Sequence, residues 1–184
     1  MSDDNAKTPT DAARAITGTL ETIDGRVALR FELGLSHSVD RVWRAVSVPE
    51  ELASWFPAAV DWTPAKGESF EAGGATLEIT EVEPQRLLAW TFAGELQSFE
   101  IQAVQEGCRL TFTHVFDDRT LAAQTAAGWD AYLLRLDPYL CGRPVTEEMA
   151  HEHWAAVHEH YAQKFGVDPE LGRKFAASLR ASQD

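Results

Sequence analysis

The feature that most constrains this chain is a run of short alternating segments between residues 57 and 116, followed directly by one long helical pattern. Glycine and proline separate the alternating segments at hairpin spacing, which predicts an antiparallel meander. One face of such a sheet and one stripe of such a helix must each be buried, and they can cover each other. The sequence therefore predicts a strongly curved antiparallel sheet wrapped around one long helix. The expected strands are AVDWT, ESFEA, ATLEITEVE, RLLAWTF, SFEIQAV and CRLTFTHVF.

The residues before the meander predict one hairpin and two short helices. Asp24-Gly25 divides two alternating segments and suits the positive φ angles of a tight hairpin turn. The apolar period then changes to that of a helix, for which Ser38 is the expected N-cap, and Pro49 suits the first position of a second helix. Together with the meander, these elements place the chain in the α+β class.

The helix after the meander begins near Thr120 and carries a broad apolar stripe that extends to Leu140. Pro138 is expected to kink or end this helix, because proline lacks an amide hydrogen and its ring clashes with the preceding turn. Such a helix must lie against the sheet, so the two elements together define the core of the predicted domain.

Two extra helices are expected after the core domain, in the segments TEEMAHEHWAAVHEHYAQKF and GVDPELGRKFAASLR. Their apolar stripes must be buried against the domain or against another chain, so a homodimer or a protein partner through these helices stays an open alternative. We therefore expect three parts: a disordered acidic and polar tail at 1–18, a core domain at 19–142, and a helical extension at 143–184.

The segment HEHWAAVHEH contains four of the six histidines, which raises the question of a metal site. A helix chelates an ion best through histidines four residues apart, as in HExxH. His151 and His158 are instead seven residues apart, as are His153 and His160, which is about two turns or roughly 10 Å. Neither pair can hold one ion, so we predict no metal site and place these histidines on the polar flank of a docking helix.

The net charge of −13 excludes some partners, because the acidic excess is not confined to a tail. It disfavours nucleic acid and anionic membrane surfaces. Cys108 and Cys141 are too few and too far apart for a disulfide framework or a thiolate metal site, which indicates a reduced, cytoplasmic protein. No segment approaches the length of a membrane span, and the first residues lack the apolar core of a signal peptide.

Four segments in order resemble the START-like, helix-grip (SRPBCC) superfamily, in the branch named after the heat-shock protein 90 ATPase activator homologues. The first segment has a Val-Trp helix, a Pro-Glu-Glu-Leu turn and a Trp-Phe pair, and the last has a closing Gly-Trp helix. The resemblance extends from about residue 26 to about residue 142 and includes polyketide cyclase-like proteins. The segments are SHSVDRVWRAVSVPEELASWFP, GGATLEITEVEPQRLLAWTF, GCRLTFTHVF and GWDAYLLRLDPYL.

The resemblance implies a cavity between the closing helix and the concave face of the sheet, where members of the superfamily bind small apolar or amphipathic molecules. The alternative, that the inward residues fill this space among themselves as a close-packed core, stays open. His114 and Tyr132 are the polar groups that periodicity places inside, and either could fix the polar end of a ligand. The candidate pocket residues are Trp90, Phe99, Ile101, Phe112, His114, Trp129, Tyr132, Leu133 and Leu136.

No catalytic arrangement is recognisable in the sequence. It contains no nucleophile elbow, zinc signature or phosphate loop, and we predict no cofactor. We therefore expect a non-catalytic pocket for a small apolar molecule. Two alternatives stay open: a chaperone-associated role, suggested by the name of the branch, and a cyclase- or hydrolase-type enzyme that uses the same cavity.

Overall fold

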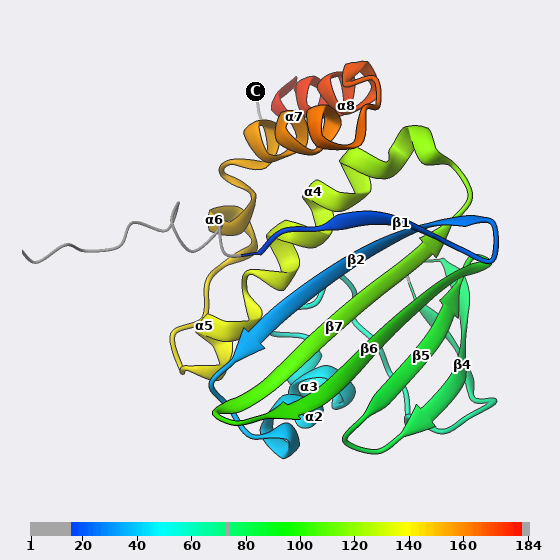
Figure 1. Cartoon of the computed structure of the whole chain (residues 1–184), viewed down its shortest axis with the longest axis vertical. Helices are drawn as coiled ribbons and strands as arrows, with labels where there is room; N and C mark the ends of the chain where they lie inside the picture. Colours follow the sequence, from blue (N-terminus) through cyan, green and yellow to red (C-terminus); the bar gives the residue numbers. More distant parts are fainter. Residues whose placement is uncertain (1–15, 73, 182–184) are drawn as a thin grey trace, which may run out of the picture.

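The computed structural model describes residues 16–72 and 74–181. Their strands are β1 (Thr19–Ile23), β2 (Arg26–Leu35), β3 (Ser69–Ala72), β4 (Ala75–Glu83), β5 (Leu87–Phe92), β6 (Glu95–Val104) and β7 (Gly107–Phe116). All neighbours pair antiparallel in one curved sheet with the order β1-β2-β7-β6-β5-β4-β3 (Figure 1). Helix α4 (Ala122–Leu133) covers the concave face, so the α+β helix-grip fold expected from the sequence is confirmed. Most of the expected tail, residues 1–15, lies outside the described residues.

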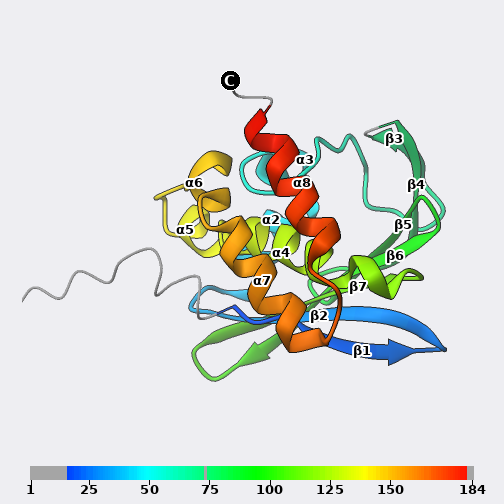
Figure 2. The same cartoon turned by 90° about the horizontal axis from the view of Figure 1, so that it is seen from above.

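The described helices form two groups. Between β2 and β3 lie α2 (Val39–Ser47) and α3 (Pro49–Leu52). In the second group, α7 (Trp154–Phe165) and α8 (Glu170–Ala181) lie side by side, at the top of the view in Figure 1 and toward the viewer in Figure 2. None of the described helices is long and apolar enough to cross a membrane. After β7 the chain forms a 3-10 turn (Arg119–Leu121), α4, α5 (Leu136–Leu140), α6 (Glu147–His151), α7 (Trp154–Phe165) and α8 (Glu170–Ala181).

Local sequence signals before the meander act as expected. Asp24 and Gly25 have φ angles of 50° and 81°, which form the tight turn between β1 and β2. Ser38 caps α2, because its hydroxyl accepts a hydrogen bond from the amide of Arg41 at 3.2 Å. Pro49 occupies the first turn of α3, where its missing amide hydrogen costs nothing. These three predictions are therefore confirmed.

The expected strand AVDWT is wrong. Residues 59–63 form no strand, although Val60 and Trp62 are buried as the alternation requires. Side-chain contacts hold Trp62: its indole Nε1 donates to the carbonyl of Ser47 at 2.8 Å, and its ring centroid lies 5.5 Å from that of Trp90. Alternation in this segment therefore indicates burial without a partner strand.

The long helix expected to reach Leu140 is divided into α4 and α5. The division falls at residues 134 and 135, one turn before Pro138. The proline ring would clash with the carbonyl four residues earlier, and the proline cannot donate a hydrogen bond to it. The helix is therefore interrupted upstream of the proline rather than at the proline itself.

Helix α4 is buried on two sides, whereas the sequence predicts one stripe. Trp129 contacts the sheet, while Asp130 is buried and accepts a hydrogen bond from Tyr161 in α7. The first extra helix, expected as one element, is divided into α6 and α7, and its stripe is buried against the domain core. Helix α8 lies outside α7 and leaves Leu171 and Phe175 exposed.

The concave face of the sheet is built from inward-pointing cross-strand pairs. In one row, Phe99 lies opposite Phe112 on β7. In the next row, Gln97 lies between Trp90 on β5 and His114 on β7. All five side chains are buried. A polar pair therefore stands in an otherwise aromatic part of the concave face, directly beneath α4.

Candidate functional site

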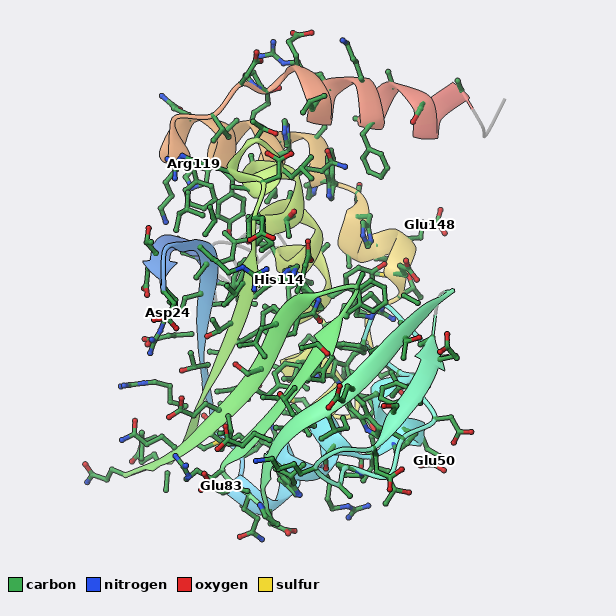
Figure 3. The ribbon with its side chains drawn as sticks, turned by 90° about the vertical axis from the view of Figure 1, so that its right-hand side faces the viewer. Asp24, Glu50, Glu83, His114, Arg119 and Glu148 are labelled. Carbon is green, nitrogen blue, oxygen red and sulfur yellow. The ribbon has the colours of Figure 1, made fainter. Side chains whose placement is uncertain are left out.

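Eight of the nine candidate pocket residues are buried in the core that α4 and the sheet share. They come from β5, β6, β7, α4 and α5, and each of them is buried. Figure 3 shows His114 at this boundary, between the strands and the helix. The eight residues are Trp90, Phe99, Ile101, Phe112, His114, Trp129, Leu133 and Leu136.

The aromatic members of this group contact one another through their rings. The Phe112 centroid lies 4.2 Å from that of Trp129 and 5.3 Å from that of Phe99. Phe99 lies 5.2 Å from Trp90, and Phe56, which follows α3, lies 5.7 Å from Trp129. The interior is thus a continuous aromatic cluster, and a ligand can enter this part of it only where side chains move apart.

The imidazole of His114 is buried, and both of its nitrogens are engaged. The indole Nε1 of Trp129 donates to Nδ1 at 2.9 Å. Because Nδ1 accepts that hydrogen, the ring proton lies on Nε2, which donates to a carboxylate oxygen of Glu95 at 2.6 Å. The contact with Trp129 therefore fixes the tautomer and directs the imidazole donor toward Glu95.

Two members of the site, Glu95 and Gln97, are not among the residues expected from the sequence. Strand β6 begins at Glu95, three residues before the expected start at Ser98. The Gln97 amide lies 3.5 Å from Nε2 of His114, and the side chain of Glu95 is 40% exposed. Extending the alternation backwards from Phe99 would have placed both residues on the inner face. Glu95, Gln97 and His114 form what we call the polar cluster.

Tyr132 lies outside this interior, so its expected inward position is corrected. Its hydroxyl donates to a carboxylate oxygen of Glu147 in α6 at 2.6 Å, and its ring centroid lies 5.0 Å from that of His151. The adjacent residue, Leu133, is fully buried, and neighbouring positions on a helix face different directions. Partial burial, with the hydrogen bond to Glu147, raises the pKa of Tyr132 to about 12. Tyr132 thus acts as a donor that holds α6 against α4.

A second buried polar network joins α4, α7 and the residue before β1. The hydroxyl of Tyr161 donates to Asp130 at 2.6 Å and accepts a hydrogen bond from the amide of Gly18 at 2.9 Å. The ammonium of Lys164 donates to the carbonyl of Gly18 at 2.8 Å. Burial raises the pKa of Asp130 to about 6, although the hydrogen bond from Tyr161 acts in the opposite direction. This network fastens the C-terminal extension to the domain.

The four histidines of the C-terminal segment occupy different environments. His153 and His160 are exposed, but His158 is buried and stacks on Trp154 with 5.2 Å between ring centroids. A Cβ atom at Gly172 would lie 2.0 Å from Nε2 of His158, so this glycine lets α8 approach the imidazole. Burial lowers the pKa of His158. The expected polar flank is therefore wrong for His158, because α8 covers it.

A sequence model of the family described as Activator of Hsp90 ATPase homolog 1-like protein matches residues 36–141, which is more than half of the chain. The chain belongs to this family. The resemblance seen in the four sequence segments is thereby confirmed. The polar cluster and Trp129 lie within the matched range, whereas α6, α7 and α8 lie beyond it.

Solved structures are similar to the chain in fold. CalU16 from Micromonospora echinospora has a TM-score of 0.61 and 23% identity, over 78% of this chain and 98% of that chain. DynU16, from the dynemicin biosynthetic locus, has a TM-score of 0.55 and 28% identity, over 64% of this chain and 48% of that chain. The Aha1 dimer from Colwellia psychrerythraea has a TM-score of 0.54 and 21% identity, over 61% and 95% of the two chains. Comparison with curated proteins gives no match.

Proposed function

We propose that the protein binds a small apolar or amphipathic molecule between α4 and the concave face of the sheet, without catalysis. The observation that carries this proposal is the position of the polar cluster. It runs from buried His114 to partly exposed Glu95 along an otherwise apolar face. Ligand pockets combine a mainly apolar lining with a few placed polar groups, and this arrangement supplies both. Membership of the family supports the same conclusion.

The hydrogen bonds of the polar cluster indicate the chemistry of the ligand. His114 offers one N–H donor, which Glu95 accepts in this structure. The carboxylate of Glu95 can turn toward solvent, because its side chain is 40% exposed. A carbonyl or hydroxyl oxygen of a ligand would then take its place on the imidazole. Glu95 also disfavours an anionic ligand by repulsion, so the proposed ligand is uncharged and carries a hydrogen-bond acceptor.

A dye-displacement experiment tests this proposal. Nile red, an uncharged apolar dye, should bind the full-length chain saturably, and an apolar ketone should displace it better than the matched hydrocarbon. The expected preference is roughly 2- to 10-fold, because one net hydrogen bond is worth about 0.5–1.5 kcal/mol. His114→Phe should keep dye binding but lose this preference. Glu100→Gln is the matched control, because Glu100 is exposed on the same strand.

Two results of the displacement experiment would reject the proposal. One is a folded parent protein that binds no dye saturably. The other is a preference for the ketone that persists unchanged in His114→Phe, since the donor would then lie elsewhere. A heat-shock protein 90 pull-down that retains the chain, combined with failure of dye binding, would favour the chaperone-associated alternative.

We also propose that α8 pairs with a second copy of the chain. It exposes Leu171, which is 48% accessible, and the structurally similar Aha1 protein is described as a dimer. Leu171→Glu should reduce the mass measured by light scattering, whereas Lys174→Glu, at an exposed neighbouring position, should not. A parent that is monomeric at high concentration would reject this pairing.

The two free cysteines support our further proposal of a cytoplasmic location.

A further inference from the structure

Three potential metal ligands from two separate segments come together beside α5. Nε2 of His37, in the loop after β2, lies 3.6 Å from Sγ of Cys141 and 3.6 Å from Oδ1 of Asp137. The three donor atoms all lie within 4.8 Å of one another. His37 and Cys141 are 104 positions apart in the sequence, so the fold, rather than a local motif, creates this cluster.

The surrounding structure holds the three side chains in place. Asp137 and Cys141 are four residues apart, and the amide of Cys141 donates to the carbonyl of Asp137 at 3.0 Å. Cys141 is the C-cap of α5, and this hydrogen bond keeps its side chain on the same side of the helix end as that of Asp137. Arg41 in α2 lies over the ring of Tyr139 in α5, with 5.5 Å to the centroid. This contact holds α5 against α2, which begins two residues after His37.

The two separations from the His37 nitrogen are close to those between ligands of one tetrahedral ion. Zinc bonds are about 2.3 Å to a thiolate and about 2.0–2.1 Å to an imidazole or a carboxylate oxygen. At tetrahedral angles these bond lengths separate sulfur from nitrogen by about 3.5 Å, and nitrogen from oxygen by about 3.3 Å. The observed separations from the His37 nitrogen, 3.6 Å to each partner, are close to these values, and all three donor atoms lie within 4.8 Å of one another.

The same three residue types also occur in nucleophilic triads, but the geometry differs. In a triad the nucleophile and the carboxylate bind opposite nitrogens of the imidazole. Here the sulfur of Cys141 and the oxygen of Asp137 both approach Nε2 of His37. Two donors beside the same imidazole nitrogen do not form a proton relay, and a grouping of three donor atoms within 4.8 Å suits the ligands of an ion.

We propose that His37, Asp137 and Cys141 bind one Zn²⁺ per chain, with the fourth coordination position open to solvent. Sulfur and imidazole ligands favour zinc and similar transition metals over magnesium or calcium. A thiolate and a carboxylate balance the two charges of the ion. Asp137 and Cys141 are exposed and His37 is partly exposed, which gives the ion access. Three protein ligands with one open position are typical of reactive zinc sites.

Cobalt binding to the untagged, full-length chain tests this site, because Co²⁺ replaces Zn²⁺ and absorbs visible light. The parent should bind one Co²⁺ per chain, with the visible bands of a tetrahedral ion and a thiolate-to-cobalt band in the near ultraviolet. Addition of Zn²⁺ should remove both signals. Cys141→Ser should abolish the thiolate band. His37→Gln and Asp137→Asn should each weaken binding at least about 10-fold, since loss of even an outer-shell partner has that effect.

A matched control separates this site from the histidine-rich helices. The triple variant His151→Gln, His153→Gln, His160→Gln should retain the full thiolate band, and circular dichroism should show that every variant is folded. The proposal is overturned if the parent binds Co²⁺ without a thiolate band. It is equally overturned if the band survives in Cys141→Ser, or if it disappears in the triple histidine variant.

Discussion

Asp130→Asn should change how the stability of the protein depends on pH. Asp130 is 3% exposed, and burial raises its pKa from the ordinary value of 3.8 to about 6. The folded protein therefore binds the proton of this carboxyl more tightly than the unfolded chain does. Its stabilising contribution is fully present below pH 3.8 and is lost as the pH rises through about 6. Each pH unit between the two pKa values is worth about 1.4 kcal/mol, so ionised Asp130 costs the fold about 3 kcal/mol at neutral pH.

The assay is urea unfolding of parent and variant, followed by tryptophan fluorescence, between about pH 4 and pH 7.5. Asparagine still accepts the hydrogen bond from Tyr161 but does not titrate. The free energy of unfolding of the variant, relative to the parent, should therefore rise by about 2–3 kcal/mol across this range. Any constant cost of placing an amide there cancels in this comparison.

Glu106→Gln, at an exposed position in the turn between β6 and β7, is the matched control for the titration of other carboxyls. The difference in free energy of unfolding between Glu106→Gln and the parent should not rise with pH in the same way. If the difference in free energy of unfolding between Asp130→Asn and the parent stays constant with pH, burial does not raise the pKa of Asp130. The carboxyl would then titrate alike in the folded and unfolded chains.

Three further substitutions test the packing. Trp129→Ala should destabilise the protein by about 3–5 kcal/mol in urea unfolding, since the indole lies 4.2 Å from Phe112 between centroids; an unchanged midpoint would refute its place in the core. Tyr161→Phe should cost about 1–3 kcal/mol, because the amide of Gly18 loses its acceptor, and equal stability would show that water replaces the hydroxyl. Gly172→Ala should increase amide hydrogen exchange in α8, because the new Cβ would overlap a buried imidazole; unchanged protection would contradict the close approach.

The elements predicted correctly are those that short-range signals define. The hairpin at Asp24-Gly25 and the cap at Ser38 depend on residues within a few positions of each other, and the structure contains both. Strand alternation likewise places Phe99, Phe112 and His114 together on the inner face. The expected strand at 59–63 is wrong because alternation indicates only that side chains are buried. A strand also needs a neighbouring strand to pair with, which the local sequence does not specify.

The placements that fail depend on contacts between distant segments. Tyr132 was expected to face the sheet, but α6 offers it the carboxylate of Glu147. His158 was expected at a polar flank, but α8 covers it. Glu95 is missed because it directly follows Gly94, so the sequence places it in the turn rather than in the strand. The cluster of His37 with Cys141 joins positions 104 residues apart, which spacing within one motif cannot reveal.

Native mass spectrometry of the protein purified from its source organism shows directly whether the interior holds a ligand. We expect one uncharged small molecule per folded chain, which is released when the chain unfolds and contains a carbonyl or hydroxyl oxygen. A mass equal to that of the chain alone, from protein whose fold is shown to be intact, would contradict the claim. The aromatic interior would then be a closed core, and interaction with another protein would become the better account of function.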